Sequence, residues 1–227
     1  MKDELMLTQD GTLTVQSGQF GVSYHSMHGA WTETQHVFIQ NGLAYLENSK
    51  DSINILEMGF GTGMNALATL EYARDNSLNI HYTTIEKFPL ESSIIDDLMD
   101  QWVNLKLPEY SDIFRQIHAL EFNTQDCITT NFSFEKYCQD ILVFNSVPRY
   151  DLIYFDAFGP ETQPELWTAD LMASVYDWLL PDGVLVTYCA QGQFKRNLRQ
   201  VGFTVEALPG PPGKREMTRA IKLRYDQ

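Results

Sequence analysis

The chain is poor in positive charge, in cysteine pairs and in long apolar runs. Its 16 Lys and Arg are outnumbered by 30 Asp and Glu, so the net charge is −14, which disfavours a protein whose whole surface binds phosphate. The three cysteines, Cys127, Cys138 and Cys189, lack C-x-x-C spacing, so neither a disulfide framework nor a zinc site is predicted. There is no signal-peptide pattern and no run of about 18 apolar residues. These absences predict a cytoplasmic protein that binds no metal and no membrane.

The positive charge that is present lies mostly near the end of the chain. Residues 195–227 carry a net charge of +5, and the other residues carry −19. An acidic body with one basic segment could direct a polyanion to one edge of the molecule. On charge alone, a solvated helix face and edge strand explain the segment equally well.

A glycine-rich loop at 57–63 carries the strongest functional signal. It follows the β-branched run 53–56, which is typical of a buried parallel strand, and precedes 65–75, which is rich in helix formers. Strand, glycine turn and helix predict a nucleotide-type ligand at the turn, because glycines let a ligand approach the amides of the helix N-terminus. Met64 stands where a dinucleotide fingerprint needs its third glycine, which disfavours NAD and FAD.

Acidic residues accompany the ends of the first two expected strands. Glu57 opens the glycine loop, and Glu86 ends the second strand, 80–85. A carboxylate at this end of a strand can accept hydrogen bonds from both hydroxyls of a ribose. Acidic surroundings also suit the sulfonium and ammonium charges of S-adenosylmethionine (SAM), so SAM is the predicted cofactor. Its predicted contacts are Glu57, Gly59, Phe60, Gly61, Gly63, Asn65, Glu86 and Asp140.

The rest of the chain alternates between strand and helix patterns. Further strands are expected at 132–138, 151–156, 184–188, 203–205 and 217–223, and helices at 89–101, 111–120, 164–180 and 193–200. This alternation predicts an α/β fold with a doubly wound, Rossmann-like parallel sheet. Residues 1–50 are expected to form an N-terminal layer, with a hairpin turning at Asp10-Gly11 and a helix beginning near Thr32, ahead of a SAM-binding domain at 51–227.

In such a sheet the ligand lies outside the carboxyl ends of the strands. Two more acids are expected there: Asp140, just beyond the strand 132–138, and Asp156, at the end of the strand 151–156. Asp140 could accept a hydrogen bond from the adenine amino group, although an exposed loop acid has the same pattern. Asp156 ends an apolar strand, where an acid is seldom only a solvated charge. We therefore predict Asp156 as the catalytic residue.

Several motifs together resemble the methyltransferase domain of MnmC and its stand-alone relatives, called MnmD. The matching segments are 29–38 (GAWTETQHVF), 56–65 (LEMGFGTGMN), 86–90 (EKFPL), 155–160 (FDAFGP), 164–167 (PELW), 194–196 (FKR) and 213–217 (GKREM). Gly159 departs from the family pattern, which more often has alanine. The resemblance covers nearly the whole chain and implies a mostly parallel methyltransferase sheet with a last antiparallel strand.

The resemblance also implies a reaction and a partner. The expected activity is SAM-dependent methylation of the amine of 5-aminomethyl-2-thiouridine at the tRNA wobble position, which gives 5-methylaminomethyl-2-thiouridine. The flavin oxidoreductase half of the bifunctional relatives is not expected in this chain, because no residues for it follow Gln227. A separate oxidoreductase would then act upstream.

The substrate is expected to meet aromatic and basic residues. Phe158, Trp167 and Tyr188 are expected to wall the pocket for the flipped base, although core packing explains Trp167 and Tyr188 equally well. Asp156 is expected first to orient the amine and second to accept its proton. The predicted contacts to anticodon phosphates are Lys195, Arg196, Lys214 and Arg215.

Three other interpretations stay open. The run 150–156 loosely resembles the two-aspartate strand of spermidine-synthase-type aminopropyltransferases; the acidic net charge suits that enzyme, but the basic segment does not. A small-molecule amine methyltransferase would use the same SAM site. A catalytically silent SAM-binding module is the third, since one fold hosts many functions, although the intact Glu57, Glu86 and Asp156 argue against it. The oligomeric state has no signal in the sequence.

Overall fold

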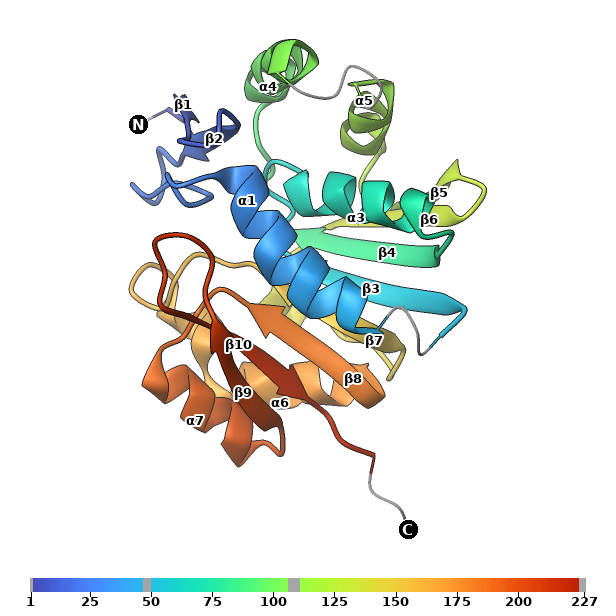
Figure 1. The fold of residues 1–227 in the computed structure, drawn as a ribbon, viewed down its shortest axis with the longest axis vertical. Helices are drawn as coiled ribbons and strands as arrows, with labels where there is room; N and C mark the ends of the chain where they lie inside the picture. Colours follow the sequence, from blue (N-terminus) through green and yellow to red (C-terminus); the bar gives the residue numbers. More distant parts are fainter. Residues whose placement is uncertain (1, 47–49, 106–110, 225–227) are drawn as a thin grey trace.

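An eight-stranded sheet forms the centre of the computed structural model, which describes residues 2–46, 50–105 and 111–224 (Figure 1). The strands lie in the order β5-β6-β4-β3-β7-β8-β10-β9. Their bounds are β3 (Ser52–Met58), β4 (Asn79–Glu86), β5 (Thr124–Thr129), β6 (Phe132–Cys138), β7 (Tyr150–Phe155), β8 (Leu179–Thr187), β9 (Thr204–Pro209) and β10 (Glu216–Ile221). The five strands from β6 to β8 are parallel, whereas β5 and β10 are antiparallel to their neighbours. The mostly parallel sheet with a last antiparallel strand is confirmed.

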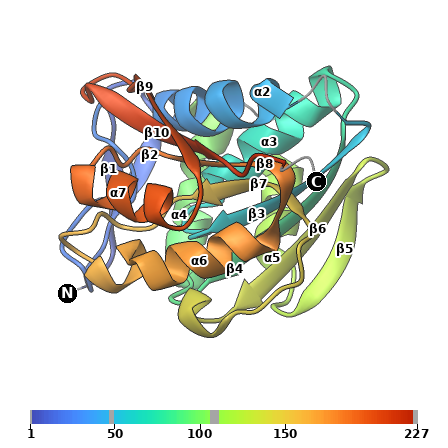
Figure 2. The same ribbon diagram turned by 90° about the horizontal axis from the view of Figure 1, so that it is seen from below.

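Helices cover both faces of the sheet (Figure 2). One face carries α1 (Ala30–Thr34), the π-helical segment η1 (Gln35–Leu43), α2 (Ala44–Leu46), α3 (Met64–Asp75), α4 (Ser92–Leu105) and α5 (Ser111–Ala119), and the other carries α6 (Ala169–Trp178) and α7 (Gly192–Gln200). Strand β7 shows why both faces must be covered, because all six of its residues are buried. Leu152 and Tyr154 pack in the first core, and Ile153 and Phe155 pack in the second, as the alternation of strand side chains requires.

The N-terminal segment forms the predicted hairpin and shares the core of the sheet. Strands β1 (Glu4–Leu7) and β2 (Leu13–Gln16) pair antiparallel, and Gly11 in the turn has a positive φ of 82°. The Asp10 carboxylate ties this turn to the first helix, because Oδ2 accepts hydrogen bonds from the backbone N–H and the hydroxyl of Thr32, at 3.0 and 2.9 Å. Side chains of β2 and η1 belong to the same core as β3 and β4. The division into 1–50 and 51–227 therefore stays a prediction.

Several predicted boundaries differ from the structure. The helix predicted at 164–180 is split into the 3-10 turn η4 (Pro164–Trp167) and α6, because Thr168 is extended and its hydroxyl caps α6 by accepting from the Leu171 N–H at 3.3 Å. The helix predicted from Pro89 begins at Ser92, and the first helix extends from residue 30 to residue 46. Strand β5 was not predicted, because its side chains are mostly exposed and polar.

A buried aspartate forms an ion pair at the amino end of β7. The Asp151 side chain is 2% exposed and pairs with Lys50. Its Oδ2 also accepts the backbone N–H of Asn54 at 2.8 Å and the Asn54 side-chain amide at 3.1 Å. Asp151 thus lies at the opposite end of the strand from Asp156, so only one of the two acids in the run 150–156 can reach a ligand at the carboxyl ends.

We expect Asp151→Ala to lower the free energy of unfolding by about 3 kcal/mol, because the donors of Asn54 and Lys50 lose a buried partner. Urea denaturation measures this loss, and the dependence of the unfolding free energy on urea concentration should stay unchanged. Asp75→Ala is the matched control, since the Arg74–Asp75 pair is more than half exposed on both sides, and we expect it to change stability by no more than about 0.5 kcal/mol. Equal losses in the two variants would contradict a structural role for Asp151.

Candidate active site

A hollow of about 910 Å³, partly open to solvent, lies at the carboxyl ends of β3, β4 and β7. The sheet side of the lining comes from the glycine loop 59–62 and from segments 85–88, 139–142 and 156–158. The N-terminal segment closes the other side with Phe20, Tyr24 and His25. We call this hollow the strand-end cavity.

The glycine loop approaches its neighbours too closely for side chains. Gly59 has a φ of +90°, and a Cβ there would lie 2.7 Å from the carbonyl oxygen of Asp156. Gly61 has a φ of +49°, and its Cβ would lie 2.8 Å from the ring of Tyr24. Gly63 is the N-cap of α3 and lies outside the lining, whereas Phe60 and Asn65 contribute to it. The loop therefore presents backbone to the cavity.

Glu86 lies beside this loop in the lining of the cavity. Its Oε2 accepts the Gly61 N–H at 3.0 Å, and its Oε1 accepts the Phe88 N–H at 2.8 Å. Burial raises the pKa of the Glu86 carboxyl, against the lowering effect of these N–H groups. Because each carboxylate oxygen has a second lone pair, both can still accept a hydroxyl from a ligand.

Glu57 lies outside the lining of the strand-end cavity. Its side chain is fully buried, its Oε2 accepts the Thr84 hydroxyl at 2.7 Å, and Oε1 has no hydrogen-bond partner among the described residues. Burial raises the pKa of Glu57 well above its ordinary value. The structure therefore places Glu57 behind the glycine loop rather than facing the cavity.

Asp140 lines the cavity beyond the end of β6. It caps the short 3-10 helix η3 (Ile141–Val143) by accepting the Leu142 N–H at 3.0 Å, and its other oxygen pairs with Lys87 at 2.6 Å. Burial raises the pKa of Asp140, but the bonds from Lys87 and Leu142 outweigh it, so the net pKa is lowered. Asp140 is an ionised acceptor at the cavity rim.

Asp156 contacts the cavity from the end of β7. Its Oδ2 accepts the Asn65 amide at 2.8 Å, and Asn65 in turn accepts the Thr34 hydroxyl at 2.8 Å. Burial, and then the negative charge of Glu33, raise the pKa of Asp156 to about 7, against the opposing effects of Asn65 and Lys214. A carboxyl group with this pKa can exchange a proton near neutral pH.

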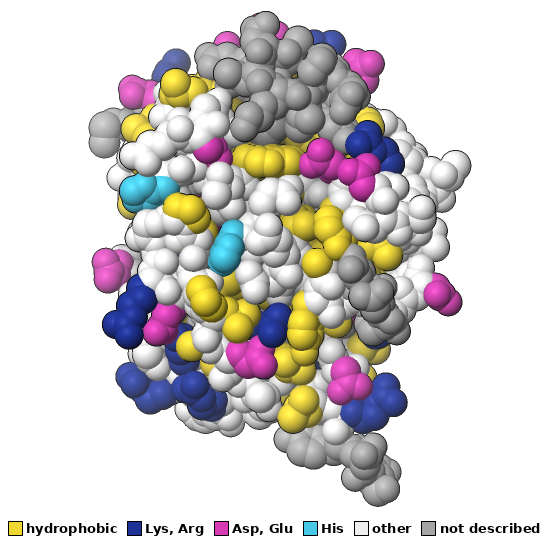
Figure 3. All heavy atoms as spheres, in the orientation of Figure 1, with side chains coloured by type: hydrophobic (Ala, Val, Ile, Leu, Met, Phe, Trp, Pro, Cys, Tyr) yellow, Lys and Arg dark blue, Asp and Glu magenta, His cyan; other side chains and the backbone are white. Residues whose placement is uncertain are grey.

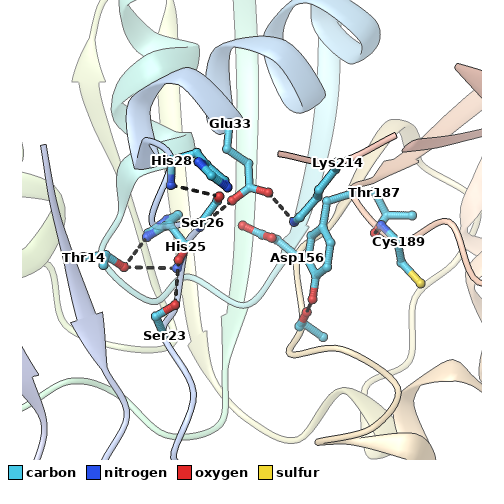
Figure 4. A network of polar contacts seen from close by, with 12 residues as sticks. Thr14, Ser23, His25, Ser26, His28, Glu33, Asp156, Thr187, Cys189 and Lys214 are labelled. Atoms are coloured by element: carbon cyan, nitrogen blue, oxygen red, sulfur yellow. Dashed lines mark hydrogen bonds and ion pairs between the residues drawn. The ribbon is translucent and has the colours of Figure 1, made fainter. Parts of the chain in front are cut away.

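Glu33 and Lys214 lie beside Asp156 as an ion pair (Figure 4). Glu33 comes from α1 and is 7% exposed, and Lys214 comes from the loop before β10. Glu33 was not predicted as a site residue. Both residues lie in segments that carry the family resemblance, but 181 positions separate them, and sequence spacing gives no signal for such a contact.

The three predicted aromatic residues lie in different surroundings. Phe158 lines the strand-end cavity, with its ring centroid 5.0 Å from those of both Phe20 and Tyr24. Tyr188 donates its hydroxyl to the Ala157 carbonyl at 2.7 Å and lines a second, shallower hollow. Trp167 is 4% exposed, lines neither hollow, and donates its Nε1–H to the Phe158 carbonyl at 2.9 Å. Trp167 thus supports the loop that carries Phe158.

The second hollow adjoins the strand-end cavity along the loop 156–162. It is lined by segments 159–162, 188–191 and 214–216. Of the predicted basic contacts, Lys195 is 8% exposed and pairs with Glu216 at 2.8 Å, and Lys214 pairs with Glu33. Arg196 is exposed on α7, and the Arg215 side chain is 94% exposed at the hollow. Lys and Arg side chains gather on this part of the molecule (Figure 3).

Comparison with known proteins shows which sequences this chain is similar to. Residues 97–223 match a family model described as S-adenosyl-L-methionine-dependent methyltransferase. The chain is 30% identical, over 94% of its length, to the tRNA 5-methylaminomethyl-2-thiouridine biosynthesis bifunctional protein MnmC of Burkholderia multivorans, and 31% identical, over 93%, to the MnmC of Leptospira borgpetersenii. It covers 34% of each of these proteins, so it spans about a third of their length.

Solved structures share the fold. MnmC2 from Aquifex aeolicus matches with a TM-score of 0.79 and 24% identity, covering 96% of this chain and 70% of that one. A spermidine synthase from Thermotoga maritima matches with a TM-score of 0.59 and 15% identity, covering 97% and 69%. Across the described ranges, no helix is long and apolar enough to cross a membrane.

Proposed function

Because the chain belongs to the S-adenosyl-L-methionine-dependent methyltransferases of the MnmC type, we propose that it methylates the amine of 5-aminomethyl-2-thiouridine at the tRNA wobble position, giving 5-methylaminomethyl-2-thiouridine. The observation that carries this proposal is Asp156, an acid with a pKa near 7 that lines the strand-end cavity, next to a second hollow edged by Arg215. A tRNA substrate would place the reaction in the cytoplasm. An upstream flavin oxidoreductase, acting as a separate protein, belongs to the same proposal.

The residues of the strand-end cavity fit SAM. Gly59 and Gly61 let the loop backbone line the cavity while it packs closely against Asp156 and Tyr24. Glu86 has free lone pairs for the ribose hydroxyls, and Asp140 can accept from the adenine amino group. When bound, SAM supplies an electrophilic methyl group on a sulfonium sulfur. Glu57, which lies behind the loop, would act on the cofactor only through the loop.

Asp156 would prepare the attacking amine. A free alkyl amine has a pKa of about 10 and is mostly protonated at neutral pH, and a protonated nitrogen has no lone pair for attack. The Asp156 carboxylate would first hold the ammonium group by a charge-assisted hydrogen bond and then accept its proton, leaving a neutral amine and a neutral acid. Desolvation next to Phe158 would favour that transfer, because it penalises both charges.

The test is methyl transfer from labelled SAM to tRNA that carries 5-aminomethyl-2-thiouridine, followed by nucleoside analysis. We expect label in 5-methylaminomethyl-2-thiouridine and none in tRNA that already carries the methyl group. Transfer to small amines alone would support the small-molecule alternative. Aminopropyl transfer from decarboxylated SAM to a polyamine would support the aminopropyltransferase, and a chain that binds SAM without either activity would support the silent module.

Arg196 and Arg215 are the proposed phosphate contacts. We expect the double variant Arg196→Ala with Arg215→Ala to bind tRNA more weakly at low salt, and the slope of log affinity against log salt to decrease by roughly 0.7–0.9 for each lost contact. Arg115→Ala, on the exposed side of α5, is the matched control and should leave the slope unchanged. An unchanged slope in the double variant would remove this edge from the tRNA interface.

A further inference from the structure

Lys214 is enclosed by partners in a way that an exposed phosphate contact would not be. Its ammonium pairs with Glu33 and lies 3.8 Å from the centroid of the Tyr188 ring. The Asp156 carboxylate faces the same ammonium (Figure 4). Only 32% of the Lys214 side chain is exposed. One carboxylate and one aromatic face thus contact the cation directly, and the Asp156 carboxylate lies near it without forming an ion pair.

Glu33 and Tyr188 are themselves held by hydrogen bonds to the backbone. Glu33 accepts the Ser26 N–H at 2.8 Å, and the Tyr188 hydroxyl is held by the Ala157 carbonyl at 2.7 Å. The loop that carries Lys214 is seated against the N-terminal segment, because a Cβ on Gly213 would lie 2.0 Å from the His28 ring. The ammonium therefore has little freedom to swing out to a ligand in solvent.

The charges of this cluster match an amine better than a phosphate. With Asp156 ionised, the two carboxylates and the ammonium carry one net negative charge, which a single protonated amine would neutralise. A phosphate at Lys214 would instead have to compete with Glu33 and approach Asp156, and like charges at close range repel in such a poorly hydrated site. The cluster also lies where the strand-end cavity and the second hollow meet.

We propose that Lys214, held by Glu33, is a positioning residue of the acceptor site rather than a contact to tRNA phosphate, and that Glu33, Lys214 and Asp156 form a cradle for one protonated amine. This inference rests on the proposed function for the identity of that amine. Lys214 acts through Asp156: it keeps part of the carboxylate ionised while Glu33 opposes it, so the pair sets the pH at which Asp156 can take the proton.

The two partners of the pair should shift the pKa of Asp156 in opposite directions. Removing the Lys214 charge removes a cation that lowers this pKa, and removing the Glu33 charge removes an anion that raises it. The other titratable groups near Asp156 and the pair are the same in all variants. They are Glu57, Tyr82, Tyr188, Cys189 and His25, whose imidazole pKa is lowered by burial to about 4.

The experiment is an NMR titration of protein labelled with ¹³C at the aspartate carboxyl carbons, with S-adenosylhomocysteine bound. The Asp156 signal is the one that Asp156→Asn removes. We expect Lys214→Met to raise the pKa of Asp156 by about 1, Glu33→Gln to lower it, and the double variant to return close to the wild-type value. Lys214→Arg keeps the charge and should keep the pKa, which separates charge from packing if the Met variant is poorly folded.

Lys195→Met is the matched control, because Lys195 also pairs with a glutamate but is not among the charges that act on Asp156. It should leave the Asp156 titration unchanged. An Asp156 pKa that is equal in wild type, Lys214→Met and Glu33→Gln overturns the proposal. Since the titration uses no tRNA, this result is independent of whether the proposed function holds.

A second measurement uses the tRNA substrate. At a pH below the shifted pKa, Lys214→Met should slow single-turnover methyl transfer about tenfold, as a pKa rise of about 1 requires, with tRNA affinity and its salt slope unchanged. If Lys214→Met instead decreased the slope of log tRNA affinity against log salt, as expected for the Arg196 and Arg215 double variant, the positioning role would be overturned. Such a decrease would show that Lys214 contacts a tRNA phosphate.

Discussion

Asp156→Asn is expected to lose most methyl transfer while it keeps the fold and SAM binding. The amide has the shape of the carboxyl group and can still accept the Asn65 hydrogen bond, but it cannot take a proton or balance an ammonium charge. Loss of a positioned general base costs about 10²–10⁴-fold in rate. The measurement is single-turnover transfer from labelled SAM to tRNA with 5-aminomethyl-2-thiouridine, across a range of pH.

The pH dependence of the wild-type rate tests which protonation state of Asp156 is active. Because the pKa of Asp156 is about 7, the wild-type rate should rise as pH increases through neutrality, and the residual rate of the variant should lack this limb. Asp170→Asn, an exposed aspartate of α6, is the matched control with wild-type rates. A variant rate equal to wild type near neutral pH would make Asp156 structural.

Stability gives an independent check on the same substitution. The pKa of Asp156 is raised in the folded protein, so the neutral acid is the favoured form, and its contribution to stability is lost as pH rises from the ordinary value of 3.8 through about 7. At a pH above this window the wild type holds an unfavourable buried charge that Asn lacks. Asp156→Asn should therefore be at least as stable as wild type at mildly alkaline pH, so that lost activity there cannot come from unfolding.

Strand-end positions were the predictable part of the site. Alternating strands and helices define a parallel sheet, and a parallel sheet brings the carboxyl ends of its strands to one edge. Glu86, Asp140 and Asp156 follow three such strands and all line the strand-end cavity. Their roles toward SAM and the amine stay predictions.

The alternation of side chains between the two faces of a strand explains why Glu57 does not reach the cavity. Ile53 and Ile55 of β3 pack in the core under α3, whereas Leu56 and Met58 pack in the core of the other face. Glu57 alternates with the first set, so its side chain points under α3 and meets Thr84. This placement follows from the two-residue period of a strand, which an analysis of strand ends alone does not use.

Contacts between distant segments could not be predicted. The sequence shows that Lys195 and Lys214 are basic, but not that Glu216 and Glu33 neutralise them. Glu216 is already counted in the net charge of residues 195–227, but Glu33 lies outside that segment, so the formal charge does not show that Lys214 is neutralised. Arg196 and Arg215 remain exposed, although the Arg215 guanidinium lies 3.8 Å from the same Glu216.

The second large effect is expected at Glu86, where Glu86→Ala should weaken SAM binding by at least about 100-fold. Two charge-assisted hydrogen bonds to ribose hydroxyls contribute roughly 1.5–3 kcal/mol each at most, and the Gly61 and Phe88 N–H groups also lose their acceptor. Glu86→Gln keeps one acceptor oxygen and the shape, so its loss should be smaller. Calorimetric titration with SAM measures both, with Glu91→Gln, at an exposed position, as the matched control.

Loss of affinity alone does not show that Glu86 contacts the ribose, because the carboxylate also fastens the glycine loop. A double-mutant cycle separates the two roles by comparing 5′-methylthioadenosine with its 2′-deoxy analogue. If Glu86 accepts the hydroxyl, wild type should bind the deoxy analogue about tenfold or more weakly, and Glu86→Ala should bind the two ligands almost equally. If the variant still discriminates, the ribose lies elsewhere in the strand-end cavity and Glu86 acts only on the loop. In that case Glu86→Ala should lower the affinity for both ligands by the same factor, because a loosened loop affects every ligand that contacts Gly59 and Gly61.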